Sequence, residues 1–156
     1  MNAKARKSGF SLLELVIVVV IIGIIAAIAV PRMSRGSGGA AEKALASNLA
    51  VFRNAIDLYS AEHNGAFPTV PNIDAQLTQY SSLAGATQAT KDTTYVYGPY
   101  VRKISSIPVG TKVGNSGIAA ADGAGVGWIY NQTTGAITAN AGAAETDSEG
   151  TKFIDY

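Results

Sequence analysis

The chain has no cysteine, one histidine and few charged side chains, which make up 15% of its 156 residues. The lack of cysteine excludes disulfide bonds and thiol chemistry. The histidine, His63, lies next to the end of an expected helix, where a hydrogen-bonding or positively charged role is favoured over a catalytic one. No nucleophile elbow, phosphate-binding loop or zinc-ligand spacing is present. The sequence therefore indicates a protein that is not an enzyme.

Charge is nearly balanced along the chain, with 12 basic and 11 acidic side chains. Three of the basic residues, Lys4, Arg6 and Lys7, lie in the first nine positions, which hold no acidic residue. Without those nine positions the chain has nine basic and eleven acidic side chains, a net charge of −2. This argues against a nucleic-acid partner, which favours a strongly basic surface.

One long apolar segment dominates the amino-terminal part of the chain. From Phe10 to Val30 the only charged residue is Glu14. A helix of that length is roughly 31 Å long at about 1.5 Å per residue, which matches the hydrocarbon core of a bilayer. The segment therefore predicts a transmembrane helix. An acidic side chain costs roughly 2.5 to 3.5 kcal/mol near the centre of such a helix and less near its end, so Glu14 requires a partner.

A cut after Gly9 would create that partner. It leaves the amine of Phe10 at the start of the helix, where the helix dipole is also positive, and Glu14 lies one turn further on. The charge pair can form within one chain, or between neighbouring chains in a stack of parallel helices. Because both charges would be desolvated together, the second arrangement would recruit a new subunit in register.

The chain resembles type IV pilins and type II secretion pseudopilins in its class III signal, which reads Gly9-Phe10-Ser11-Leu12-Leu13-Glu14. The basic leader, the apolar run and the following Pro31 belong to the same resemblance. It implies cleavage between Gly9 and Phe10 by a prepilin peptidase, methylation of the Phe10 amine, and a role for Glu14 in assembly.

The resemblance also implies partners and a location. The subunit would lie in membrane lipid of the bacterial inner membrane before assembly, contact an assembly platform there, and associate with itself into a filament that serves protein secretion. The three leader charges and the terminal amine outnumber Arg32 and Arg35, which favours a cytoplasmic amino terminus and a periplasmic carboxy-terminal domain. The small soluble domain and the lack of cysteine favour a secretion pseudopilin over an adhesive pilin.

Two other interpretations fit parts of this segment. An ordinary secretory signal would use the basic residues and a cut after Ala27-Ile28-Ala29. Its apolar run would be unusually long, Glu14 would interrupt it, and Pro31 would follow the cut closely. A plain single-pass anchor is the second interpretation. In either case the chain would be a membrane-anchored or secreted ligand-binding module that does not polymerise.

Glycines and a proline interrupt the helical pattern after the apolar run. Pro31 removes one backbone hydrogen bond, and each of Gly36, Gly38 and Gly39 costs about 1 kcal/mol relative to alanine inside a helix. We expect the helix to bend, loosen or break between Pro31 and Gly39, with a flexible linker as the alternative. The chain then divides into a leader, a transmembrane and assembly helix, a Pro/Gly-rich break and a soluble pilin-like domain, at residues 1–9, 10–30, 31–39 and 40–156.

The soluble domain begins with a helical pattern. Apolar residues recur at steps of three and four, at Leu45, Leu49, Phe52, Ile56 and Tyr59. Four further residues are expected to widen this stripe, namely Ala44, Val51, Ala55 and Leu58. Asn64-Gly65 supplies a stop signal. The stripe predicts a helix that packs against a sheet made later in the chain.

Strand signals follow a loop-rich connector at residues 66–92, which holds a short helix around Ile73 to Tyr80 with Asn72 as its cap. We expect strands at 93–97 and 100–104, then a hairpin of 126–130 and 136–139 around a five-residue turn. The predicted fold is α+β, with a long amino-terminal helix, membrane-spanning in its first half, packed against a small carboxy-terminal antiparallel sheet.

An acidic cluster near the carboxy end contains Glu145, Asp147 and Glu149. The resemblance to major pseudopilins implies calcium binding in loops near the carboxy end. Calcium takes six to eight oxygen ligands, so a calcium site is one interpretation of this cluster. The spacing matches no defined calcium loop. A solvated, mobile acidic loop is the favoured alternative.

Overall fold

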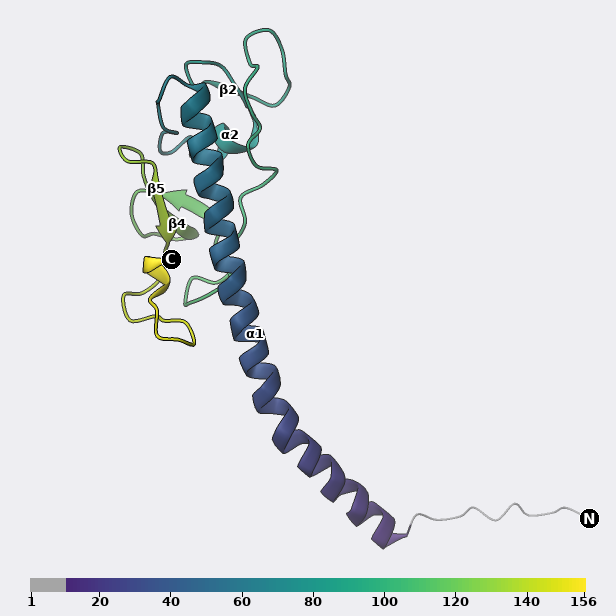
Figure 1. The fold of residues 1–156 in the computed structure, drawn as a ribbon. Helices are drawn as coiled ribbons and strands as arrows, with labels where there is room; N and C mark the ends of the chain where they lie inside the picture. The colour runs from purple at the N-terminus through teal and green to yellow at the C-terminus, as the bar shows by residue number, and fades with distance from the viewer. Residues whose placement is uncertain (1–10) are drawn as a thin grey trace, which may run out of the picture. The chain divides into compact units, whose positions relative to one another are not determined.

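The computed structural model describes residues 11–156, apart from the side chains of residues 28–37. Its contacts divide the chain into two compact units that meet between Ser37 and Gly38. Helix α1 (Leu12–Glu62) contributes to both units. The other elements all belong to the second unit (Figure 1): α2 (Ile73–Thr78), β1 (Tyr80–Ser81), β2 (Thr87–Gln88), β3 (Gly117–Ala119), β4 (Val126–Asn131), β5 (Ala136–Ala139) and the 3-10 helix η1 (Phe153–Asp155).

The core of the second unit lies between α1 and the sheet of β3, β4 and β5, which confirms the predicted α+β plan. The predicted helical stripe is buried, since none of its five residues is more than 2% exposed. Phe52 meets Trp128 of β4 edge to face, with ring centroids 5.0 Å apart. Burying a side chain of this size stabilises a fold by roughly 1.5 to 3 kcal/mol, so this contact helps to hold the sheet on the helix.

The buried face of α1 is narrower than the sequence pattern predicted. Ala55 is buried, but Val51 and Leu58 are 50% and 51% exposed, and Ala44 is exposed as well. Val51 and Leu58 each precede a core residue by one position, which turns them about 100° around the helix axis. The small sheet covers only one side of α1, so these two residues lie outside the contact.

The predicted hairpin is confirmed as β4 and β5, which pair antiparallel with Trp128 opposite Ala139. Asn131 still belongs to β4 and pairs with Ala136, so the turn is one residue shorter than expected. Gly135 closes it with φ of 73°, a left-handed conformation that glycine adopts without strain. The sheet is mixed rather than antiparallel throughout, because the short strand β3 pairs parallel with β4.

The prediction of strands at 93–97 and 100–104 is wrong, because neither range forms a strand. Tyr97 makes one isolated bridge to Ser81, and the backbone N–H groups of Tyr100 and Val101 both donate to the carbonyl of Leu77, at 2.9 and 3.0 Å. Both N–H groups are therefore hydrogen-bonded to one carbonyl near the end of α2, and not to a neighbouring strand. Asn72 precedes α2 as predicted, but its side chain makes no capping hydrogen bond.

Helical structure runs through residues 31–39 of α1, so the described secondary structure shows no break there. The missing N–H of Pro31 and the three glycines weaken the helix at this point without ending it. The boundary between the two compact units falls in the same segment. The expected bend or loosening of the helix stays a prediction.

Candidate assembly site at the start of helix α1

Helix α1 begins with a capping box formed by Ser11 and Glu14. The Ser11 hydroxyl accepts the backbone N–H of Leu13 at 3.3 Å, and Glu14 Oε2 accepts the backbone N–H of Ser11 at 3.2 Å. The first N–H groups of a helix have no partner within it, so a serine followed three residues later by glutamate satisfies two of them reciprocally. This local chemistry starts the helix here and orients the Glu14 side chain.

The capping role of Glu14 was not predicted from the sequence, although the Ser-x-x-Glu spacing could have indicated it. The carboxylate is exposed at the amino end of α1, where the helix dipole is positive. A negative charge in that position contributes about 0.3 to 1 kcal/mol to an exposed helix. Glu14 is therefore stabilised by its own helix, and the hydrogen bond to Ser11 uses only one of its two oxygens.

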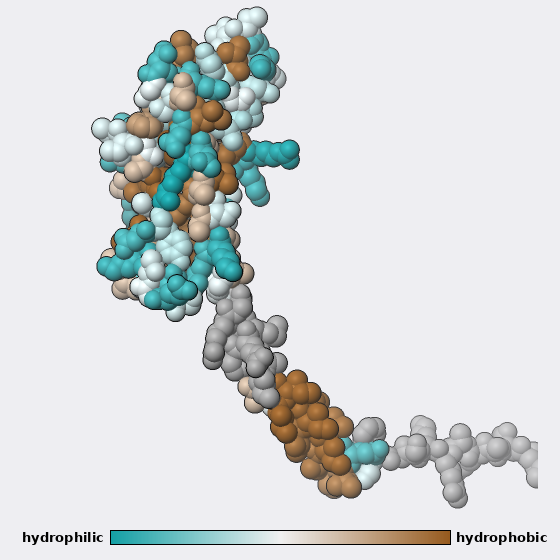
Figure 2. Space-filling model, viewed as in Figure 1, coloured by the Kyte–Doolittle hydropathy of each residue, from teal (hydrophilic) through white to brown (hydrophobic). Residues whose placement is uncertain are grey.

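The described part of the first unit exposes apolar side chains on every side. Its large hydrophobic residues, from Leu12 to Ile25, are between 45% and 79% exposed. Figure 2 shows hydrophobic residues across the visible face of this helix. A surface helix normally has a polar side, whereas the described residues 15–27 of α1 are all apolar, so their side chains require lipid or other helices to cover them.

Among the residues that the structure describes, no helix combines the length and the hydropathy needed to cross a membrane. The span predicted from Phe10 to Val30 extends past the described side chains at both ends. Gly9 and Phe10, the two residues of the predicted cleavage site, lie outside the described residues. The side chain of Pro31 does too.

The structure does not gather Glu145, Asp147 and Glu149 into one site. Glu145 accepts the backbone N–H groups of Gly142 and Thr111, at 2.7 and 2.8 Å. These two bonds, the one from Gly142 first, hold the pKa of its carboxyl below the usual value. Nowhere in residues 11–27 and 38–156 do three His, Cys, Asp or Glu side chains form a group that could hold a metal ion.

Asp147 is engaged in the same way. Its carboxylate accepts the Tyr156 hydroxyl and the backbone N–H groups of Glu149 and Thr151, the last two at 2.8 Å. The bond from Tyr156 is the largest cause that lowers the pKa of this carboxyl. Hydrogen-bond donors therefore surround both acidic groups, and the residues present do not fit the calcium site that the sequence suggested.

His63 has a structural role at the end of α1. Its Nδ1 lies 2.8 Å from the carbonyl oxygen of Tyr59, and its Nε2 lies 3.0 Å from the carbonyl oxygen of Ser82. The imidazole stacks on the Tyr59 ring at 3.8 Å. The side chain thus joins the helix to the chain beside β1, in agreement with the hydrogen-bonding role that the sequence favoured.

Comparisons with known proteins agree with the geometry at the amino end. The family described as the prokaryotic N-terminal methylation motif matches residues 4–30. The type II secretion system core protein G of Aeromonas hydrophila is 31% identical over 107 residues, which make up 69% of this chain and 71% of that protein. No solved structure matches significantly. The similarity therefore reaches well beyond the amino-terminal segment into the second unit.

Proposed function

This chain belongs to the pseudopilin family of the type II secretion system core protein G, and on that premise we propose that it is a subunit of a secretion pseudopilus. Members of this family are structural proteins without enzymatic activity. In this proposal a prepilin peptidase cuts between Gly9 and Phe10 and methylates the new amine. The subunit then leaves the bacterial inner membrane and joins the filament through α1.

The observation that carries the proposal is an apolar helix that begins with an oriented carboxylate. The described residues of the first unit expose hydrophobic side chains all round, and Glu14 is held at the start of the helix by Ser11. Lipid covers such a helix before assembly, when residues 10–30 span the membrane. In a filament, the helices of other subunits replace the lipid, and van der Waals packing between them takes over.

Glu14 selects the register of the incoming subunit. The capping bond occupies Oε2, so the other oxygen is able to accept the methylated Phe10 amine of a neighbouring copy. Removing two opposite charges from water together is favourable only when they meet closely. A subunit that is out of register leaves one of them unpaired, and this energy difference favours the correct position.

The mature amino terminus tests this function directly. Mass spectrometry of the protein from its native membrane should show a chain that begins at methylated Phe10. A chain that begins at Val30 would instead favour a secreted binding module, and an uncut leader would favour a plain anchor. Either of these outcomes contradicts the filament subunit.

A further inference from the structure

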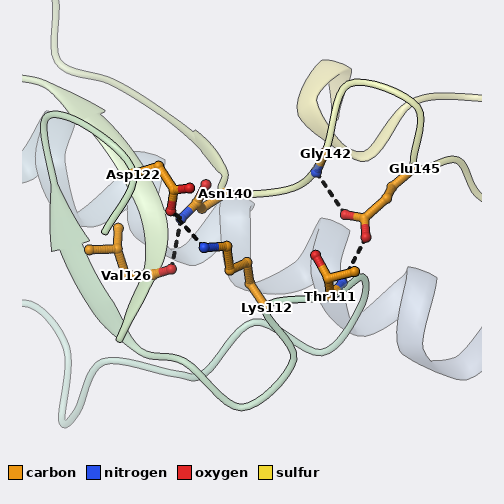
Figure 3. A network of polar contacts seen from close by, with 7 residues as sticks. All are labelled: Thr111, Lys112, Asp122, Val126, Asn140, Gly142 and Glu145. Carbon is orange, nitrogen blue, oxygen red and sulfur yellow. Dashed lines mark hydrogen bonds and ion pairs between the residues drawn. The ribbon is translucent and has the colours of Figure 1, made fainter. Parts of the chain in front are cut away.

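Three loops of the second unit meet at one network of polar contacts (Figure 3). One loop precedes β3, the second connects β3 to β4, and the third follows β5. They contribute, in chain order, Thr111 and Lys112, then Asp122, then Asn140, Gly142 and Glu145. These six residues lie outside the helices and strands, so side-chain contacts join the loops here.

Asp122 is the centre of one half of this network. Its Oδ1 accepts the Lys112 ammonium and the Asn140 amide, each at 2.8 Å. The same amide nitrogen of Asn140 donates to the carbonyl of Val126 in β4 at 2.8 Å, and Asn140 is only 7% exposed. The bond from Asn140, followed by that from Lys112, holds the pKa of Asp122 below its usual value. The carboxylate is therefore charged and held in a fixed orientation.

Glu145 is the centre of the other half. It accepts the N–H of Thr111, the residue before Lys112, and the N–H of Gly142. Gly110 has φ of 73°, and a Cβ there would lie 2.6 Å from Glu145 Oε2. The loop before β3 is thus shaped closely around this carboxylate. The charge of Lys112, which precedes both acidic residues in the chain, also helps to lower the pKa of Glu145.

We propose that the Lys112 ammonium supplies the positive charge that holds these three loops together, and that it does so in place of a bound metal ion. Calcium requires six to eight oxygen ligands at about 2.3 to 2.6 Å. The groups that contact Asp122 and Glu145 here are N–H donors and an ammonium, none of which ligates a cation. The inference goes beyond the filament function and does not depend on it.

An ion pair at the surface usually contributes little, because two flexible side chains lose freedom when they meet. Lys112 differs from that case. Asn140 already orders Asp122, and Glu145 already holds the backbone beside Lys112. Only the lysine side chain has to be ordered, so the pair holds more firmly than two free side chains would.

Thermal unfolding of the full chain in detergent tests the inference, with the fluorescence of the buried Trp128 as the signal. A ligand that binds only the folded state raises Tm. We expect the same Tm in millimolar calcium and in excess chelator, and no heat of calcium binding by titration calorimetry. A Tm that is several degrees higher in calcium would overturn the proposal.

Lys112→Met removes the ammonium and keeps an unbranched apolar side chain, so it tests the effect of the charge by itself. We expect a Tm lower by about 2 °C at low salt, and a smaller difference near 1 M salt, where the Debye length falls to about 3 Å. Lys103→Met is the matched control, because Lys103 is exposed and makes no ion pair among the described residues. Equal effects of the two substitutions would contradict the role of Lys112.

A double variant completes the test. Lys112→Met together with Asp122→Asn should melt close to the lower of the two single variants, because residues that act as a pair are not additive. Fully additive losses would mean that the ammonium and the carboxylate act independently, which is the opposite of the proposal.

Discussion

Glu14 has two partners in the proposed function, one in its own helix and one in a neighbouring subunit. The first is the backbone N–H of Ser11, which the structure places 3.2 Å from the carboxylate. The second is the methylated amine of Phe10, which belongs to the proposal. The two roles depend on different properties of the side chain, since capping needs an acceptor and pairing needs a charge.

Substitution at Glu14 separates the two roles. Glu14→Gln keeps an acceptor that suits a capping box but loses the charge, so we expect normal membrane insertion and no filaments. Glu14→Ala should give the same result with a less stable helix start. Sheared filament fractions and carbonate-resistant membrane fractions measure the two properties.

Ser11→Ala is the converse control, because it removes the hydroxyl that accepts the Leu13 N–H and keeps the charge of Glu14. The loss of a cap costs about 1 kcal/mol of local helix stability, and filaments should still form. Abundant filaments from Glu14→Gln, or their complete loss in Ser11→Ala, would show that capping and not charge decides assembly.

At the scale of elements, the second unit depends on the contact between α1 and the hairpin of β4 and β5. Phe52 and Trp128 meet there, and Tyr130 donates from β4 to the carbonyl of Pro68 at 3.0 Å. Burial raises the pKa of the Tyr130 hydroxyl to about 12. The hairpin is thus fixed to the helix by apolar packing and to the connector by a buried hydrogen bond.

Phe52→Ala should lower the free energy of unfolding of the second unit by roughly 3 to 5 kcal/mol, because it leaves a cavity beside Trp128. Val51→Ala is the matched control on the same helix, since Val51 is half exposed, and it should change the value by less than about 0.5 kcal/mol. Denaturant unfolding monitored by Trp128 fluorescence measures both. Similar losses for the two variants would mean that the buried stripe is wrongly assigned.

Three carboxyl groups predict how the loop between β3 and β4 and the loops after β5, here called the late loops, respond to acid. The pKa values of Asp122, Glu145 and Asp147 are lowered in the fold, chiefly by hydrogen bonds from Asn140, Gly142 and Tyr156 respectively. A group whose pKa is lowered by folding stabilises the fold above its ordinary pKa, near 4, and this contribution is lost as the pH falls further. The late loops should therefore loosen below about pH 4.

Amide hydrogen exchange at Thr111, Gly142 and Thr151 measures this, because each of these N–H groups donates to one of the carboxylates. Their protection should fall between about pH 4 and pH 2 after correction for intrinsic exchange. The buried helix residues should keep theirs. Protection that stays constant over this range would contradict the pKa directions.

At the scale of the whole molecule, the two units place their apolar residues in opposite ways. The described residues of the first unit expose them, and the second unit gathers them into a core. This division fits the proposed subunit, in which the first unit would exchange lipid for neighbouring helices while the second folds around its own core.

Periodic and local signals in the sequence were sufficient for part of the fold. The stripe from Leu45 to Tyr59 and the hairpin around Gly135 were predictable, because helix and strand periods and turn residues depend on near neighbours. The prediction of strands from Thr93 to Ile104 failed, because strand pairing depends on a partner elsewhere in the chain. Strand β3 was missed for the same reason, since three residues carry no readable period.

The amino-acid sequence by itself determined the family signal, the charge of Glu14 and the helical stripe, since each depends on residues within a few positions of one another. Only the tertiary structure decided how far the buried face of α1 extends beyond that stripe, and what surrounds the carboxylates of Asp122 and Glu145. Those outcomes depend on contacts such as Lys112 with Asp122 and Thr111 with Glu145. Such contacts join distant positions of the chain, and no local pattern specifies them.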